Sequence, residues 1–215
     1  MKTFIVSSGK ICASDPCYAK GTWCGNYDLP AQNGEWTAEV KYKDEGEWGN
    51  RVTSLLCQLK GGKGGKWEPL PNEVGVDSGQ AGVFCSSIYP KNEDERGDYG
   101  DLNSFYGKAC EATMGEGYEE TQICWKVKND IERKAYKGIS KEKNLEITGE
   151  VYGKDSKQYR FLRDEITEPE IPWEQFGIVA NAGVCSSSGF GDGSYSGFVK
   201  KNDKGEIVAV KIKFI

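Results

Sequence analysis

Histidine is absent from all 215 residues of this chain. Histidine is the commonest general acid–base residue of enzymes and a frequent metal ligand. Its absence excludes His-dependent catalytic triads and leaves cysteines as the main ligands for any zinc site. The serine-rich segments therefore do not indicate a serine hydrolase, and the chain also lacks the Gly-x-Ser-x-Gly pattern of a nucleophile elbow.

Long apolar runs and a basic stripe are also missing. Only a short apolar stretch follows Lys2, less than the roughly 7–15 residues of a signal-peptide core, and no run approaches the ~20 residues of a membrane span. The formal net charge is -5, whereas proteins that bind duplex nucleic acid concentrate positive charge. We therefore expect a soluble, cytoplasmic, acidic protein whose partners include neither a nucleic-acid duplex nor a membrane.

The eight cysteines form no Cys-x-x-Cys pair, and their closest cluster is Cys12, Cys17 and Cys24. Thiols are kept reduced in the cytosol, and a zinc site would need four of them at an unusual spacing. Cys85 and Cys185 each begin a Cys-Ser-Ser sequence, but no partner base identifies either as a nucleophile. We expect most of the cysteines to pack as small apolar residues.

Alternating apolar residues predict at least three β-strands. The faces expected to be buried are Trp36, Ala38, Val40 and Tyr42; then Thr53, Leu55, Cys57 and Leu59; and finally Val208, Val210, Ile212 and Phe214. Residues 202–205, Asn-Asp-Lys-Gly, predict a hairpin turn with Gly205 at positive φ. The last ~35 residues are therefore expected to form an antiparallel meander whose first turn contains Gly191, Asp192 and Gly193.

One helix is expected at residues 105–114, capped by Asn103 or Ser104 and stopped at Gly115. Nearly half of residues 126–170 are charged, against 28% of the whole chain, which is typical of a solvated insertion, either a helix and hairpin or a flap. The predicted fold is thus a single domain over residues 1–215. It is α+β and mostly β, an antiparallel sandwich or open barrel with one helix and a charged insertion at about 126–170.

A glycine-rich loop at residues 61–65 is flanked by lysines. A Walker A motif ending at Lys66 would need glycine at position 60 and serine or threonine at position 67. The chain has Lys60 and Trp67 instead, so a hairpin loop is the better interpretation.

Three aspartates stand in small-residue segments: Asp15 in Ser-Asp-Pro, Asp77 in Val-Asp-Ser-Gly, and Asp192 in Gly-Asp-Gly. The last two each lie beside a Cys-Ser-Ser strand, so residues 76–87 and 182–193 partly repeat each other. If the segments meet, their carboxylates could bind Ca²⁺ or Mg²⁺, or their backbone N–H groups could hold a polar or anionic ligand. Alternatively, each aspartate bonds only its own turn. The residues proposed for a ligand site are Asp15, Asp77, Ser78, Gly79, Gln80, Ser187, Gly191, Asp192, Gly193, Ser194 and Tyr195.

Residues 8–16, 75–82 and 188–195 together resemble the bacterial domain-of-unknown-function family 4241. The order and spacing of these segments cover nearly the whole chain apart from the highly charged segment. The resemblance implies one domain built mainly of strands, in which the three segments are important. It implies no activity, substrate or catalytic residue. Cys17, Cys24, Cys110 and Cys124 depart from the family pattern.

These observations favour a binding or interaction protein with a polar concavity formed by residues 14–16, 77–82 and 186–195. It would neutralise a toxin or sequester a small polar ligand such as a signalling nucleotide, so its partner is a protein or a small polar molecule, with no cofactor. One alternative is a metal-assisted hydrolase with Asp15, Asp77 and Asp192 as ligands of Ca²⁺ or Mg²⁺. The other is a purely structural protein.

Overall fold

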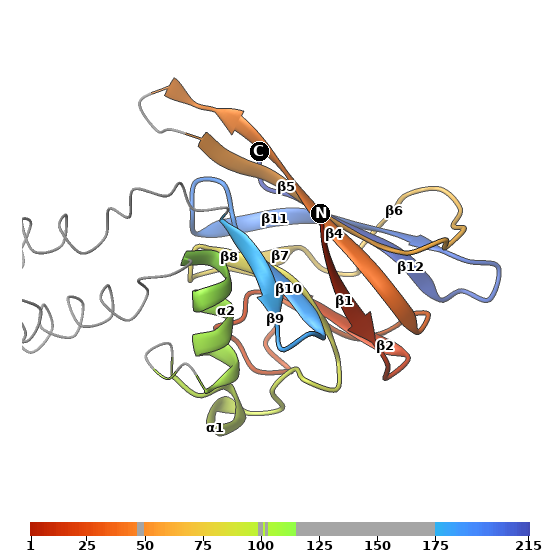
Figure 1. Cartoon of the computed structure of the whole chain (residues 1–215), viewed down its shortest axis with the longest axis horizontal. Helices are drawn as coiled ribbons and strands as arrows, with labels where there is room; N and C mark the ends of the chain where they lie inside the picture. The colour runs from red at the N-terminus through yellow and green to blue at the C-terminus, as the bar shows by residue number, and fades with distance from the viewer. Residues whose placement is uncertain (47–49, 99–100, 102, 115–174) are drawn as a thin grey trace, which may run out of the picture. The chain divides into compact units, whose positions relative to one another are not determined.

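The computed structural model describes residues 1–46, 50–98, 101, 103–114 and 175–215 (Figure 1). The charged insertion expected at about 126–170 and Gly115, the expected helix stop, lie outside these residues. The described part is dominated by antiparallel strands, which form two sheets, here called sheet A and sheet B.

Sheet A has seven strands within the described residues, in the order β1-β4-β5-β12-β11-β6, and β7 also pairs with β11. Its strands are β1 (Lys2–Val6), β4 (Gly34–Asp44), β5 (Asn50–Leu59), β6 (Glu68–Pro69), β7 (Val74–Val76), β11 (Gly193–Lys201) and β12 (Ile207–Lys213). Sheet B has the order β3-β2-β8-β10-β9. Its strands are β2 (Lys10–Ser14), β3 (Asn26–Pro30), β8 (Gln80–Cys85), β9 (Phe176–Val179) and β10 (Gly183–Ser187).

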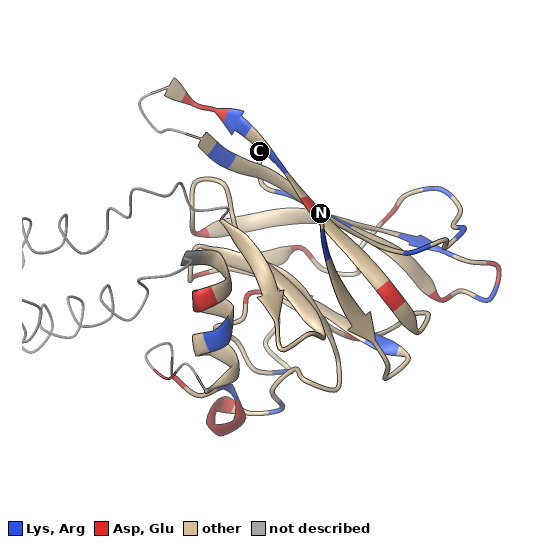
Figure 2. Ribbon diagram, in the orientation of Figure 1, with Lys and Arg blue, Asp and Glu red and all other residues tan. Residues whose placement is uncertain are grey.

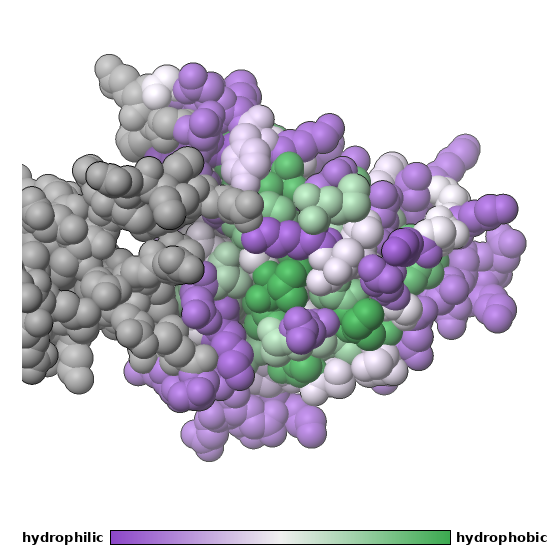
Figure 3. Space-filling model, in the orientation of Figure 1, coloured by the Kyte–Doolittle hydropathy of each residue, from purple (hydrophilic) through white to green (hydrophobic). Residues whose placement is uncertain are grey.

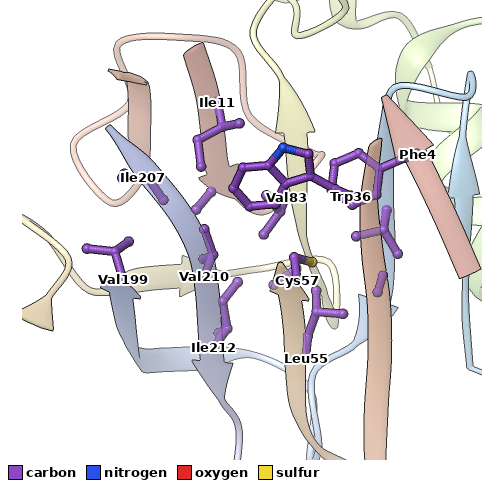
Figure 4. Close-up of a cluster of buried hydrophobic side chains, with 14 of the residues drawn as sticks. Phe4, Ile11, Trp36, Leu55, Cys57, Val83, Val199, Ile207, Val210 and Ile212 are labelled. Carbon is purple, nitrogen blue, oxygen red and sulfur yellow. The ribbon is translucent and has the colours of Figure 1, made fainter. Parts of the chain in front are cut away.

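The main core lies between the two sheets. Figure 4 shows Trp36, Cys57 and Val210 of sheet A on one side, with Ile11 and Val83 of sheet B opposite them. All five side chains are buried. This face-to-face packing of two antiparallel sheets is a sandwich, and the sheets do not close into a barrel. The predicted mostly-β fold is therefore confirmed.

The central strand of sheet B, β8, is buried on both faces. Along β8, Ala81, Val83 and Cys85 face sheet A, whereas Phe84 packs with Ala109 of the helix α2 (Phe105–Met114) in a second apolar cluster. The strands β8, β9 and β10 carry no charged residue, which is why the centre of Figure 2 is tan. Continuous apolar strands of this kind are expected where both faces of a sheet are covered.

The predicted helix is confirmed as α2, and Ser104 is its cap because the Ser104 Oγ accepts a hydrogen bond from the Gly107 N–H at 3.0 Å. The structure adds a single-turn helix, α1 (Glu93–Arg96), capped by Asn92. The α2 helix can lie close to β9 because of Gly177. A Cβ at this position would lie 2.4 Å from the Ala112 carbonyl oxygen.

The predicted strand faces are correct except at one end of the β4–β5 pair. Lys41 pairs with Ser54 and Tyr42 pairs with Val52, so Thr53 is an extra residue in β5. This bulge reverses the alternation of β5, and Val52 is buried in place of Thr53. Tyr42 is 45% exposed, because the ends of β4 and β5 project beyond the other strands there (Figure 1).

Two predicted connections are also wrong. The β11–β12 hairpin and the positive φ of Gly205 are confirmed, but β10 belongs to sheet B and β11 to sheet A. The turn that contains Asp192 therefore crosses between the sheets and does not begin a meander. The glycine-rich loop is not a hairpin loop either, since β12 and β11 lie between β5 and β6. It crosses the ends of those two strands.

Apolar side chains gather over β1, β9 and β10 on the face shown in Figure 3. These strands include an edge of each sheet, and the Ile5 N–H donates a hydrogen bond to the Asn181 carbonyl at 2.9 Å. The two edges are thereby joined on this side of the sandwich. No helix within the described residues is long and apolar enough to cross a membrane.

Candidate functional site

Two connections between the sheets cross side by side. The segment 77–79 leads from β7 in sheet A to β8 in sheet B, and the segment 188–192 leads from β10 in sheet B back to β11 in sheet A. Since β8 pairs with β10 and β7 pairs with β11, the two turns must face each other. β2 pairs with β8 and ends at Ser14, which brings Asp15 to the same place. We call residues 15–18, 77–79 and 188–192 the turn cluster.

The two crossing turns are joined directly. The Gly79 N–H donates to the Asp192 Oδ1 at 3.2 Å, and the Ser188 N–H donates to the Gly79 carbonyl at 3.0 Å. A Cβ on Gly79 would lie 3.9 Å from the Gly191 Cα. The partial sequence repeat thus corresponds to two turns in contact.

Asp15 is buried beneath this contact, with no exposed surface. Its Oδ1 accepts hydrogen bonds from the Cys17 N–H at 2.7 Å and the Ser78 Oγ at 2.6 Å. Its Oδ2 accepts from the N–H groups of Asp77 and Ser78, both at 2.8 Å. Four donors satisfy the buried carboxylate, so its function in the fold is to hold the 77–79 turn against the end of β2.

Asp77 and Asp192, by contrast, are exposed. The Asp77 Oδ2 accepts a hydrogen bond from the Tyr18 hydroxyl. Burial, together with this hydrogen bond, raises the pKa of Tyr18, so the hydroxyl remains a donor. The cluster therefore presents two carboxylates to solvent, one on each turn.

The turn around Asp192 is shaped by its own side chains. Gly191 has φ 105°, a conformation that glycine adopts without steric cost. Its carbonyl accepts from the Ser188 Oγ at 2.8 Å and the Tyr195 hydroxyl at 2.7 Å. The Tyr195 ring packs edge-on against Phe214, with centroids 5.2 Å apart. Tyr195 thus fixes the turn to the core.

The other proposed site residues are not all brought together. Gln80 is 3% exposed and lies on the α2 side of β8, where its Nε2 donates to the Cys110 Sγ and its Oε1 accepts from the Cys185 Sγ. The Ser194 Oγ donates to Glu73 at 2.6 Å, and the Ser187 N–H donates to the Gln175 carbonyl. The structure therefore unites Asp15, Asp77, Ser78, Gly79, Gly191 and Asp192 and places Gln80 beneath the helix.

Most backbone N–H groups of the turn cluster already donate hydrogen bonds within the protein, so they are not available to an anion. Those of Asp77 and Ser78 bind Asp15, that of Gly79 binds Asp192, and that of Gly191 binds the Ser188 carbonyl. Nor do the described residues include any group of three or more Cys, Asp and Glu side chains arranged to hold a metal ion. The cluster is electrostatically suited to a cationic group.

Two exposed aromatic residues accompany the carboxylates. Trp23 is 87% exposed in the loop that follows Tyr18, and Phe190 is 56% exposed at the tip of the 188–192 turn. The Gly75 N–H donates to the Cys24 carbonyl at 2.9 Å, which holds the Trp23 loop against β7. Neither residue was predicted from the sequence as part of the site, although the position of Phe190 between Gly189 and Gly191 indicated an aromatic side chain in a turn.

Cys85 lies apart from the turn cluster, at the end of β8, and its Sγ is within hydrogen-bond distance of three serines. The Ser87 Oγ lies 3.0 Å and the Ser8 Oγ 3.2 Å from its Sγ, and the Ser7 N–H donates to it at 3.5 Å. Burial alone would raise the pKa of Cys85, but these hydrogen bonds outweigh it and lower the pKa to about 6. Cys185 has no such surroundings, and burial raises its pKa. Both cysteines precede a Ser-Ser pair in the sequence, so the difference arises from Ser7 and Ser8, which the fold brings to Cys85 alone.

Comparison with known proteins gives one result. The model of DUF4241, described as a protein of unknown function, matches residues 4–212. Neither curated proteins nor solved structures show a significant match.

Proposed function

Because this chain belongs to the DUF4241 family, whose description gives no function, we propose from the turn cluster alone that it is a protein-binding protein. Its partner presents basic side chains to Asp77 and Asp192. The observation that supports this proposal is the direction of the hydrogen bonds within the cluster. The N–H groups of residues 77–79 donate to Asp15 and Asp192 and are therefore occupied, whereas Asp77 and Asp192 are themselves exposed and present negative charge to solvent.

The two exposed aromatic residues add apolar contact area, which the carboxylates do not provide. Tryptophan is enriched among the residues that dominate binding energy at interfaces, and Trp23 buries little of its surface within this chain. Phe190 stands two residues from Asp192. A partner that covered these rings would exclude water from the carboxylates and strengthen their attraction to lysine or arginine. The net charge of -5 would also accelerate encounter with a basic partner.

A toxin with a basic working surface fits this description, so we retain toxin neutralisation as the specific form of the proposal. Sequestration of a nucleotide at the turn cluster has less support, because the N–H groups of residues 77–79 already bind the carboxylates of Asp15 and Asp192, and the exposed carboxylates would repel phosphate groups. The metal-assisted hydrolase would need the Asp15 carboxylate, which already accepts four hydrogen bonds. Calorimetric titration with Mg²⁺, Ca²⁺ and Mn²⁺ tests that alternative directly.

Native mass spectrometry of the protein isolated from its own host cell tests the proposal. We expect the wild-type chain to retain a protein partner, and the double variant Asp77→Asn, Asp192→Asn to lose it. Both substitutions keep the side-chain shape and one acceptor oxygen, so the fold should persist. The double variant Asp94→Asn, Glu111→Gln removes the same two charges at exposed positions on α1 and α2 and should retain the partner.

A second variant, Trp23→Ala, tests the proposal independently of the carboxylates. It removes the exposed ring without altering charge, and we expect at least a tenfold loss of affinity for the same partner with an unchanged urea midpoint. Retention of the partner at full affinity by both the double carboxylate variant and Trp23→Ala, with normal stability, would show that the turn cluster is not the binding surface.

A further inference from the structure

A groove of about 470 Å³ lies at one end of sheet A, away from the residues of the turn cluster. One wall is the glycine-rich loop, residues 61–65, with Leu59 and Lys60 before it. The other is the β11–β12 turn, residues 202–204, and Gln32 also lines the groove. The two walls meet because the loop crosses the ends of β12 and β11 on its way from β5 to β6. The volume is within the range of small-molecule sites.

The glycines of this loop are explained by packing. A Cβ on Gly64 would lie 2.7 Å from the Val208 Cγ2 and 2.9 Å from the Lys200 Cβ, and one on Gly62 would lie 2.9 Å from the Leu59 Cβ. The Gly65 N–H donates to the Lys201 carbonyl at 2.9 Å, which fixes the loop across the strand ends. The glycines therefore allow the backbone to lie flat against the sheet.

Packing does not explain why lysines stand among these glycines and in the facing turn. Lys60, Lys63 and Lys204 line the groove, and Asp203 is its one acidic lining residue. Within the described part of the chain, the ammonium groups of Lys63 and Lys204 make no ion pair or hydrogen bond. Lys60 lies 3.5 Å from Glu35, an exposed pair of the kind that contributes little to stability and exchanges readily with another anion.

Three other lysines belong to the same loop or to the strands that it crosses. Lys66 follows the groove-lining residues along the loop, and Lys200 and Lys211 lie over the ring of Trp67 at 5.0 Å and 4.6 Å from its centroid. Figure 2 shows several blue segments in these loops, together with red ones. The N–H groups of Lys63 and Gly64, in the same part of the structure, have no acceptor among the described residues and are available to a ligand.

We infer that this groove binds a small molecule that carries linked phosphate groups. Lysine is a common phosphate ligand that acts as a point charge, and two loops supply three lysines around one groove. The mode differs from a P-loop, because a strand, β6, follows the glycine-rich segment and no helix N-terminus is present there. We choose a small ligand over a long nucleic acid because the groove, at about 470 Å³, has the volume of a small-molecule site.

Isothermal titration with inorganic triphosphate at low salt tests this inference. We expect saturable binding by the wild type, weakened at least about tenfold in the Lys63→Gln, Lys204→Gln double variant, because each lost charge-assisted contact lowers affinity severalfold or more. The double variant Lys41→Gln, Lys91→Gln removes the same two charges at exposed positions outside the groove; it is the matched control and should bind as the wild type does. The affinity of the wild type should fall steeply as salt is added.

Three outcomes would overturn the inference: no binding by the wild type, equal binding by the wild type and the groove variant, or equal weakening by the Lys41→Gln, Lys91→Gln control. Tighter binding of a single-stranded oligonucleotide than of triphosphate would also contradict the choice of a small ligand. None of these results depends on the protein partner proposed for the turn cluster, because the variants leave Asp77, Asp192 and Trp23 unchanged.

Discussion

The Gly79 N–H donates a hydrogen bond to the carboxylate of Asp192, which lies 113 positions later in the chain. This bond joins the two turns whose sequences partly repeat each other. The contact follows from pairing, because β8 with β10 and β7 with β11 bring both crossings to the same place. A glycine is suited to the position since Gly79 has φ 70°.

Asp15 is expected to stabilise the turn cluster strongly. Asp15→Ala removes the acceptor of three backbone N–H groups and the Ser78 hydroxyl. Leaving these donors without a partner should lower the free energy of unfolding by about 3 kcal/mol. Urea denaturation measures the loss. Asp77→Ala, at an exposed carboxylate in the same cluster, should cost less than about 1 kcal/mol, and equal losses in the two variants would contradict the structural role of Asp15.

Gly177 is expected to determine how closely α2 packs on sheet B. In Gly177→Ala the new Cβ would lie 2.4 Å from the Ala112 carbonyl and 2.9 Å from the Ala112 Cα, both backbone atoms that cannot rotate away. The helix must shift, and we expect a loss of about 2 kcal/mol in the free energy of unfolding. Gly65→Ala is the control, because its Cβ would make only an ordinary 3.7 Å contact with the Lys201 carbonyl. A Gly177 variant as stable as the Gly65 variant would show that the helix is not held at this distance.

Cys85 is expected to ionise near pH 6, far below the ordinary thiol value of 9.0. The difference in thiolate absorbance at 240 nm between the wild type and Cys85→Ala should titrate with a midpoint at about that pH. Cys185→Ala is the control and should leave this titration unchanged, because burial raises the pKa of Cys185. A midpoint above pH 8 in the wild type would show that the serines do not stabilise the thiolate.

The same thiol should make stability depend on pH. A pKa that is lower in the folded state than in the unfolded state means that the folded protein favours the thiolate. The stabilising contribution is therefore complete above about pH 9 and is lost as the pH falls through about 6. We expect the loss of unfolding free energy in Cys85→Ala to increase from pH 6 to pH 9. A loss that did not change over this range would contradict the expectation.

Sequence patterns predicted the local features well because they depend on neighbouring residues. Alternation identified the buried faces that include Trp36, Leu55 and Val210, and Ser104 marked the start of α2. The pattern was wrong at Thr53, where a bulge adds a residue to one strand only. A bulge is a property of the pair of strands, so the periodicity of β5 alone could not indicate it.

For the candidate site, the sequence drew attention to three aspartates but could not distinguish their surroundings. Asp15, Asp77 and Asp192 look alike in their small-residue segments, yet one is buried under four donors and two are exposed. Hydrogen-bond direction depends on which strand ends meet, and that depends on contacts between segments 60 and more residues apart. The exposure of Trp23 likewise depends on how its loop lies against β7.

By itself, the sequence determined that the chain lacks histidine chemistry, that alternating strands build its fold, and that its glycine-flanked aspartates form turns. Composition and short-range periodicity are sufficient for these conclusions, because each rests on side-chain chemistry or on steric preferences of adjacent residues. Only the tertiary structure decided that the repeated turns touch, that the N–H groups of residues 77–79 already bind carboxylates, and that the glycine-rich loop and the β11–β12 turn form a groove. These features arise from the order of strands in two packed sheets, which joins residues that the chain itself keeps far apart.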